Sequence, residues 1–360
     1  MRVALALHRV RPTGGQDRYA LELARRLVPH VELDLLTIRA EGALPPQVGV
    51  RRVRTPGRPM LLAAALFRRR AAALARTGGY DVVHAVGGCL PGANVITAQF
   101  CAAEWRTLDR RAGWYQRLVS AQAVRDEAAA YRHPDLRAVI AVSRRTAGEI
   151  ERHYGPLLVP VHVVPNAVNI EEFAPRPLAP HGRRARLLFV GTYDRKGLDV
   201  AIRALARLHG DTELVAIGGG DRARYRRLAE SLGVGARVRL EPPRGDIAEA
   251  FAAADVFIFP TRYEPFGMVI AEALASGVPV VTSAVAGAAE LIVRGVAGYV
   301  VPDPEDDAAF AAAVDRILAE PGGRGAMAQG ARAAVRGLTW DAVAARTLDV
   351  YAAATRDVRA

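Results

Sequence analysis

The amino-acid sequence predicts an α/β protein built from two doubly wound domains of similar size. Short runs of β-branched and other apolar residues alternate with stretches of helical period along most of the chain. The alternation stops at residues 170–182, where Pro175, Pro177 and Pro180 crowd a polar segment, and then it restarts. A length of 360 residues also suits two ordinary domains.

The elements of the first domain follow from this alternation. We expect strands wherever a short apolar run is bounded by turn residues, at 3–7, 32–38, 81–85, 94–97, 138–141 and 161–164. The longer stretches between them have helical spacing, and we expect helices at 17–28, 60–76, 114–132 and 144–153. This domain spans residues 1–169.

The same reasoning gives the second domain, residues 183–339. Strands are expected at 186–190, 213–217, 238–240, 256–259, 278–282 and 298–301, and helices at 198–208, 223–232, 247–253, 267–275, 308–318 and 324–336. A last helix is expected after this domain, at 340–355. Open α/β sheets bind ligands at the carboxyl ends of their strands. Two such sheets joined by one linker therefore predict a central cleft between the strand ends.

Composition excludes several classes of protein. No stretch approaches the roughly 20 uninterrupted apolar residues of a membrane-spanning helix. Two cysteines, Cys89 and Cys101, do not make a disulfide framework. The net charge of +12 comes from arginine, with Lys196 as the single lysine, which points to codon bias rather than nucleic-acid binding. We therefore expect a cytoplasmic protein with no nucleic-acid partner.

In each predicted domain, a glycine-containing turn follows the first strand. Pro12-Thr13-Gly14-Gly15 leads into a helix, where free N–H groups favour phosphate, although an ordinary turn has the same composition. In the second domain Gly191 ends a strand and is followed by Arg195 and Lys196. Two adjacent cations at a strand end predict that a diphosphate leaving group binds there.

The most informative segment runs strand, turn, helix, glycine, strand over residues 254–281. Glu264 lies in its turn, Phe266, Gly267, Met268 and Val269 form the start of the helix, and Glu272 follows inside the helix. The helix start offers N–H groups to phosphate. Glu272 can accept hydrogen bonds from a ribose diol and Glu264 from sugar hydroxyls, although a glutamate is more often a solvated surface residue.

This E-x7-E segment resembles the donor site of family 4 retaining glycosyltransferases, which have the GT-B fold of two Rossmann-like domains. Ala141-Val142-Ser143, Asn166-Ala167-Val168 through Pro175, and Gly218-Gly219-Gly220 resemble other family segments in the same order. The resemblance implies that the second domain binds a nucleotide diphosphate-sugar and the first an acceptor. It also implies that the C-terminal helix, 340–360, packs back on the first domain.

One branch of the family fits the first domain best. Pro91-Gly92 and the segment from Thr97 to Glu104 resemble lipopolysaccharide core α-glucosyltransferases, which implies UDP-sugar as donor. Gln99 stands where those enzymes carry Asp, and Thr192 replaces an Arg found in many relatives. An amide orients a sugar hydroxyl but cannot act as a general base. His84, at a strand end, is a weaker acceptor-side candidate.

The sequence thus predicts a retaining glycosyltransferase that moves a hexose from a UDP-sugar to a cell-envelope glycan or glycolipid. Arg195, Lys196, Glu264 and Gln99 are the candidate catalytic residues, and Gly14, Gly15, Gly191, Phe266, Gly267, Met268, Val269 and Glu272 join the first three in donor binding. No metal site and no cofactor are expected. The alternatives are a nucleotide-sugar 2-epimerase of the same architecture and a non-catalytic nucleotide-sugar-binding protein.

A basic stretch with an apolar centre, residues 51–76, raises a further alternative. Such a segment can lie on an anionic bilayer, at roughly 1 kcal/mol per basic residue near the surface. A core-facing helix with arginine-rich ends explains the pattern equally well. We therefore expect either a purely cytoplasmic enzyme or one that sits peripherally on the inner face of the membrane.

Overall fold

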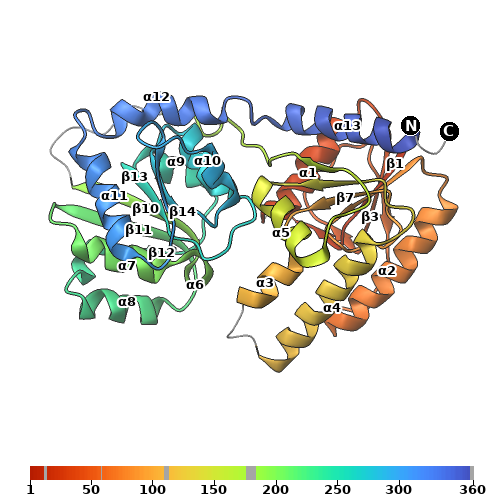
Figure 1. Cartoon of the computed structure of the whole chain (residues 1–360), viewed down its shortest axis with the longest axis horizontal. Coiled ribbons are helices and arrows are strands. Elements are labelled where there is room, and N and C mark those ends of the chain that lie inside the picture. Colours follow the sequence, from red (N-terminus) through yellow and green to blue (C-terminus); the bar gives the residue numbers. More distant parts are fainter. Residues whose placement is uncertain (12–13, 58, 109–112, 176–183, 357–360) are drawn as a thin grey trace. The chain divides into compact units, whose positions relative to one another are not determined.

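The computed structural model describes residues 1–11, 14–57, 59–108, 113–175 and 184–356. The chain divides into two compact units (Figure 1). Unit 1 comprises residues 1–166 and 340–360, and unit 2 comprises residues 167–339. Part of the proline-rich segment at 170–182, and Pro12-Thr13 of the first glycine turn, lie outside the described residues.

Unit 1 is built on a seven-stranded parallel sheet of order β5-β3-β1-β6-β7-β8-β9. The strands are β1 (Arg2–Ala6), β3 (Glu32–Thr37), β5 (Gly49–Arg52), β6 (Val82–Val86), β7 (Val95–Ala98), β8 (Ala138–Ala141) and β9 (Val161–Val163). Two short strands, β2 (Arg9–Val10) and β4 (Arg39–Ala40), pair separately. Every residue of β6, β7 and β8 is buried, as expected of parallel strands covered on both faces.

The sequence did not predict β5, because its Gly-Val-Arg-Arg composition lacks an apolar run. It pairs with β3 at the sheet edge, where three of its four residues are exposed. The basic stretch at 51–76 is therefore not one segment. Arg51 and Arg52 belong to this edge strand, and the helix α2 begins at Met60.

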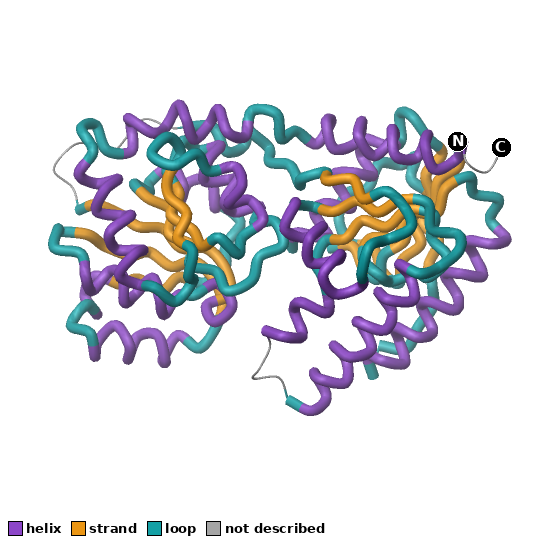
Figure 2. Tube along the Cα trace, viewed as in Figure 1, coloured by secondary structure: helices purple, strands orange, loops and turns teal. Residues whose placement is uncertain are grey.

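The helices of unit 1 lie on both sides of the sheet (Figures 1 and 2). They are α1 (Gly15–Leu27), α2 (Met60–Thr77), α3 (Ala102–Leu108), α4 (Trp114–Tyr131), α5 (Arg144–Tyr154) and α13 (Trp340–Arg356). Helix α1 begins two residues before the expected position, directly after Gly14. Helices α2 and α4 run side by side, and an ion pair between Arg68 and Asp126 joins them (Figure 1).

Helix α13 packs on unit 1 although it follows unit 2 in the sequence. Its buried residues recur at helical spacing, from Trp340 through Val343 and Thr347 to Tyr351. The Tyr351 hydroxyl lies 2.7 Å from Nδ1 of His84, and Nε2 of His84 lies 2.7 Å from Oγ1 of Thr97. The sequence offered His84 as an acceptor-side candidate at a strand end. The structure contradicts this prediction, because the His84 side chain is fully buried.

Unit 2 has a six-stranded parallel sheet of order β12-β11-β10-β13-β14-β15. The strands are β10 (Ala185–Thr192), β11 (Thr212–Gly219), β12 (Val238–Glu241), β13 (Val256–Phe259), β14 (Val280–Ser283) and β15 (Gly298–Val301). The chain leaves β10 toward β11 and β12 and then returns to β13 on the other side of β10. The carboxyl ends of β10 and β13 therefore flank the topological switch point, where such sheets bind ligands.

The helices of unit 2 are α6 (Tyr193–Lys196), α7 (Leu198–Arg207), α8 (Arg222–Ser231), α9 (Ile247–Ala252), α10 (Met268–Ala275), α11 (Asp307–Ala319) and α12 (Arg324–Val335), with 3-10 turns at Gly235–Arg237 and Gly287–Leu291. The core between sheet and helices includes Phe189, Ile202, Ile258 and Phe310. Within the described residues, no helix is long and apolar enough to cross a membrane.

Candidate active site

The predicted cations and carboxylates of unit 2 lie beside its switch point. The segment after β10 forms the short helix α6, which contains Arg195 and Lys196. The segment after β13 carries Arg262, Tyr263 and Glu264 before α10 begins. The backbone N–H of Arg262 donates to the carbonyl of Arg195 at 3.0 Å, which holds the two segments together.

Lys196 and Glu264 form an ion pair, although 68 residues separate them in the chain. The Lys196 side chain is buried and its Nζ lies 4.9 Å from the centre of the Phe259 ring. A Cβ at Gly191 would lie 2.9 Å from Cγ of Lys196, so a larger residue at this position would collide with the lysine side chain. The sheet end thus brings together the lone lysine and the first glutamate of the E-x7-E segment.

The charge on Lys196 depends on having an anion nearby. Burial, together with the positive charge of the neighbouring Arg195, lowers the pKa of the Lys196 ammonium well below its usual value. Glu264 supplies the balancing negative charge. Because Arg195 adds a second positive charge against the single carboxylate of Glu264, a net positive charge remains at this edge, and few water molecules screen it.

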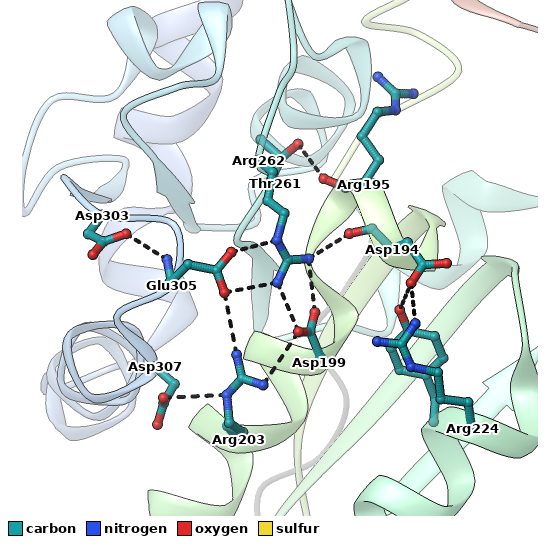
Figure 3. Close-up of polar contacts among 11 residues, drawn as sticks. Asp194, Arg195, Asp199, Arg203, Arg224, Thr261, Arg262, Asp303, Glu305 and Asp307 are labelled. Carbon is teal, nitrogen blue, oxygen red and sulfur yellow. Dashed lines mark hydrogen bonds and ion pairs between the residues drawn. The ribbon is translucent and has the colours of Figure 1, made fainter. Parts of the chain in front are cut away.

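Arg195 extends in a different direction from its neighbours. Its guanidinium points away from the cluster around Arg262 (Figure 3), and its Nη1 donates to the carbonyl of Tyr263 at 3.4 Å. Burial lowers the pKa of this guanidinium, which nevertheless stays protonated because its usual pKa is so high. Arg195 and Lys196, adjacent in sequence, therefore place two positive charges at the same sheet edge.

Arg262 is a site-forming residue that sequence analysis did not identify. Its guanidinium forms paired contacts with Asp199 of α7, at 3.0 and 2.8 Å, and with Glu305, at 2.5 and 2.9 Å (Figure 3). Although burial opposes ionisation of Asp199, its hydrogen bonds and charge interactions with Arg262 and the nearby Arg203 lower its pKa. The network fixes the turn between β13 and α10, which carries Glu264. Its members are too far apart in the chain to form a motif.

The second carboxylate of the segment lies within α10. Gly267 adopts a φ of 103°, a left-handed conformation, and α10 begins at the next residue, Met268. Glu272 is buried in the second turn. The preceding turn is held by two backbone hydrogen bonds from the 3-10 turn, Gly287 N–H to Glu264 O at 2.8 Å and Ala288 N–H to Phe266 O at 2.6 Å.

The predicted residues of unit 1 come from two of its segments. Gly14 has a φ of 110° and Gly15 is the first residue of α1, at the carboxyl end of β1. Gln99 follows β7, and its amide exchanges two hydrogen bonds with Asn166, at 3.3 and 3.1 Å. Each amide thus fixes the orientation of the other. Among the described residues, no group of three or more His, Cys, Asp or Glu is placed to hold a metal ion.

Two family models match consecutive parts of the chain. Glycosyltransferase Family 4 matches residues 13–172, and Glycosyl transferases group 1 matches residues 171–334. A D-inositol 3-phosphate glycosyltransferase of Xylanimonas cellulosilytica is 33% identical, covering 92% of this chain and 90% of the relative. The chain belongs to the family 4, group 1 glycosyltransferases. It is therefore an enzyme that takes a nucleotide-sugar donor.

Solved structures show that this glycosyltransferase has the GT-B fold. WaaG, a glycosyltransferase involved in lipopolysaccharide biosynthesis, aligns with a TM-score of 0.80 at 24% identity, over 97% of this chain and 99% of WaaG. HepE of Anabaena, solved with UDP and glucose, aligns with a TM-score of 0.74 at 20% identity, over 98% of this chain and 99% of HepE. The predicted fold class is confirmed. Two curated relatives that align over more than 90% of this chain, by contrast, are named D-inositol 3-phosphate glycosyltransferases.

Proposed function

We propose that this glycosyltransferase moves a hexose from a UDP-sugar to a cell-envelope glycan or glycolipid acceptor, with retention of anomeric configuration and without a metal ion. The observation that carries the proposal is the contact of Lys196 with Glu264 at the carboxyl edge of the unit 2 sheet. This contact puts a buried cation and a hydroxyl acceptor side by side, which are the two groups that the phosphate and the sugar of a donor need.

Each predicted donor residue then has a role. Lys196 and Arg195 stabilise the negative charge that grows on the diphosphate as the bond to the sugar breaks. Glu264 accepts hydrogen bonds from the transferred sugar while it stays beside Lys196, and Glu272 holds the ribose. The N–H groups at the start of α10, Phe266 to Val269, and the backbone at Gly191, Gly14 and Gly15 bind phosphate oxygens.

Retention follows from the groups available to take the acceptor's proton. An inverting enzyme needs a base on the face opposite the leaving group. Gln99 is an amide and is paired with Asn166, and Glu264 is paired with Lys196. In the retaining reaction the C1–phosphate bond breaks, the acceptor oxygen bonds to C1 on the same face, and a phosphate oxygen receives the proton.

Peripheral contact with an anionic membrane is a second element of the proposal. Four large apolar side chains are exposed within the first two turns of α2 and α4, namely Met60, Leu62, Trp114 and Leu118. The Met60 N–H donates to the Tyr115 hydroxyl at 3.2 Å, so the two helix starts lie together. Arg69 and Arg117 are exposed on the same two helices. Exposed aromatic and aliphatic groups beside arginines suit the surface of an anionic bilayer.

The curated relatives favour a second candidate acceptor, inositol phosphate. The observation behind it is the 33% identity of the Xylanimonas relative over almost the full length of both chains. Both candidates use the same donor chemistry and differ only in what unit 1 binds. An acceptor panel of inositol 3-phosphate, a core oligosaccharide and a glycolipid therefore separates them.

Proton NMR of the anomeric signal tests the reaction itself. The enzyme is incubated with UDP-glucose and the acceptor panel in excess chelator, and spectra are taken early in the reaction. We expect an α-linked product from the α-linked donor. A β-linked product would overturn retention, activity that requires added Mg²⁺ or Mn²⁺ would overturn the roles of Arg195 and Lys196, and a 2-epimerised nucleotide sugar would identify an epimerase.

A further inference from the structure

Arg262 joins the two segments of unit 2 that carry the charges of the donor site. It lies in the turn after β13, just before Tyr263 and Glu264. Its backbone N–H donates to the carbonyl of Arg195 at 3.0 Å, and its Nη1 donates to the carbonyl of Asp194 at 2.6 Å (Figure 3). Both carbonyls belong to α6, the short helix that also contains the buried lysine. Arg262 therefore holds the turn that carries the glutamate against the helix that carries the lysine.

Two carboxylates keep the guanidinium of Arg262 in this place. Asp199, at the start of α7, contacts it at 3.0 and 2.8 Å, and Glu305, before α11, contacts it at 2.5 and 2.9 Å (Figure 3). Paired contacts of this kind fix the plane of a guanidinium as well as its distance. The Asp199 side chain is 15% exposed and that of Glu305 is 49% exposed, so water and salt screen the Asp199 pair less. Asp199 is therefore the stronger anchor.

Each N–H group of the Arg262 guanidinium already has an acceptor. An arginine side chain has five N–H donors. Two of them donate to Asp199, two to Glu305 and one to the carbonyl of Asp194. Arg262 could bind a donor phosphate only by giving up one of these contacts. Its effect on the reaction therefore passes through the groups that it holds in place.

We propose that Arg262 is a positioning residue for sugar transfer, which sets the spacing between Lys196 and Glu264 and so the match of these two groups to the phosphate and the sugar at the transition state. The inference rests on the roles proposed above for Lys196 and Glu264. Arg262 itself exchanges no proton and forms no bond to the substrate. Its loss should lower kcat, because misplacing a reacting group by about 1 Å can cost on the order of 10²-fold in rate.

The kinetics of Arg262→Gln test this role, with Arg203→Gln as the matched control. Arg203 of α7 pairs with the same two carboxylates, Asp199 at 3.4 Å and Glu305 at 3.6 Å, and with Asp307 at 3.5 Å, none of which lies in α6 or in the turn before α10. Arg262→Gln should lower kcat with UDP-glucose roughly 10- to 100-fold. The dissociation constant of UDP should stay close to that of the wild type, because UDP lacks the transferred sugar.

The control variant, Arg203→Gln, should keep both kcat and the dissociation constant of UDP. Equal losses of kcat in Arg262→Gln and Arg203→Gln would overturn the proposal, because the network would then serve only to stabilise the fold. Far-ultraviolet circular dichroism checks that each variant folds. It is used because the tryptophans, at positions 105, 114 and 340, all lie in unit 1 and do not report on unit 2.

A double variant separates positioning from the cost of an unpaired charge. Arg262→Gln leaves the half-buried carboxylate of Asp199 without its bidentate partner, which by itself can disturb the protein. Arg262→Gln/Asp199→Asn removes both charges and does not restore the contacts to α6. We expect kcat to remain as low in the double variant as in Arg262→Gln. Recovery of kcat in the double variant would show that the unpaired carboxylate, and not the lost spacing, caused the defect.

The single lysine of the chain gives a readout that does not need turnover. Lysine labelled with ¹³C at Cε gives one NMR signal, that of Lys196, and this signal reports the pKa of Lys196. In Arg262→Gln/Asp199→Asn, which keeps the net charge, this pKa should fall by about 1, because the buried ammonium loses part of its ion pair. Arg203→Gln/Asp307→Asn is the control of equal charge and should leave it unchanged. A wild-type pKa in both double variants would contradict the proposal.

The two kinds of measurement distinguish the possible failures. If the wild type transfers glucose and Arg262→Gln keeps its kcat, the positioning role fails and the proposed function stands. If the wild type transfers glucose to no acceptor of the panel, and the pKa of Lys196 falls only in the Arg262 double variant, the proposed function fails. The assignment of Arg262 as the residue that sets the position of Lys196 then stands.

Discussion

At the residue scale, the state of Lys196 governs the donor site. Its ammonium is buried beside Arg195 and pairs with Glu264, so two positive charges face one carboxylate and the remaining positive charge attracts an anionic ligand. Lys196→Ala should lower kcat on the order of 10²-fold, as loss of one transition-state donor does. Arg227→Ala, at an exposed position of α8, is the control and should leave kcat unchanged. A wild-type kcat for Lys196→Ala would remove the lysine from the mechanism.

Substitution of Glu272 should change the steady-state kinetics differently from substitution of Lys196. Contacts to a ribose act equally in the ground state and the transition state, so Glu272→Ala should raise KM for the donor more than it lowers kcat. Steady-state kinetics with varied UDP-glucose distinguishes the two patterns. A fall in kcat at unchanged KM would place Glu272 near the reacting bond instead of the ribose.

Glu127 makes the stability of unit 1 depend on pH. Burial raises the pKa of this carboxyl from 4.5 to about 7, against the hydrogen bonds that it accepts from Tyr154 (2.7 Å) and Ala102 N–H (2.9 Å). The folded state therefore holds the proton more tightly than the unfolded state. The contribution of Glu127 to the free energy of unfolding should be greatest below pH 4.5. It should fall by about 3 kcal/mol as the pH rises to 7.

Urea unfolding followed by tryptophan fluorescence between pH 4.5 and 8 measures this dependence. Glu127→Gln is the matched variant, because its amide oxygen accepts the same hydrogen bonds and does not titrate. The variant should lose the part of the pH dependence that Glu127 contributes. Identical pH profiles for the two proteins would show that Glu127 keeps an ordinary pKa.

At the scale of elements, the start of α10 depends on one backbone conformation. Gly267 has a φ of 103°, and a Cβ there would lie 3.1 Å from both Cγ of Glu264 and Cδ1 of Ile270. Gly267→Ala should therefore cost about 1–2 kcal/mol of stability and displace Glu264. We expect UDP affinity to fall as well.

Gly245→Ala is the control for this substitution, since a Cβ at Gly245 meets nothing within 4 Å. Thermal unfolding and UDP titration of both variants give the two readouts. If Gly267→Ala binds UDP as tightly as the wild type, the start of α10 does not belong to the donor site.

At the scale of the whole molecule, the last helix ties the end of the chain to unit 1. Tyr351 of α13 lies within hydrogen-bonding distance of the buried His84, which in turn contacts Thr97. Tyr351→Phe should destabilise unit 1 by about 1–3 kcal/mol, because Nδ1 of His84 is left buried without a partner.

Urea unfolding separates the two units in this test. Tryptophan fluorescence reports on unit 1, and far-ultraviolet circular dichroism reports on both. Tyr299→Phe, in unit 2, should leave the fluorescence transition unchanged. A Tyr351→Phe variant as stable as the wild type would mean that apolar packing alone holds α13.

The sequence by itself determined the two α/β units, most of their strands and the segments that carry Lys196, Glu264 and Glu272. This was possible because parallel strands and their helices have periodic local patterns. It missed β5, whose edge position needs no apolar run, and it missed Arg262, whose partners Asp199 and Glu305 have no fixed spacing from it.

Only the tertiary structure decided which of those segments meet. The parallel sheet places the ends of β10 and β13 next to each other, so Lys196 contacts Glu264 across 68 residues of chain. The packing of helices on the sheet also buries His84 against Tyr351 and leaves a cavity lined in part by α2 and α4. Contacts of this kind depend on strand order and helix packing, which bring distant residues together without leaving a local pattern in the sequence.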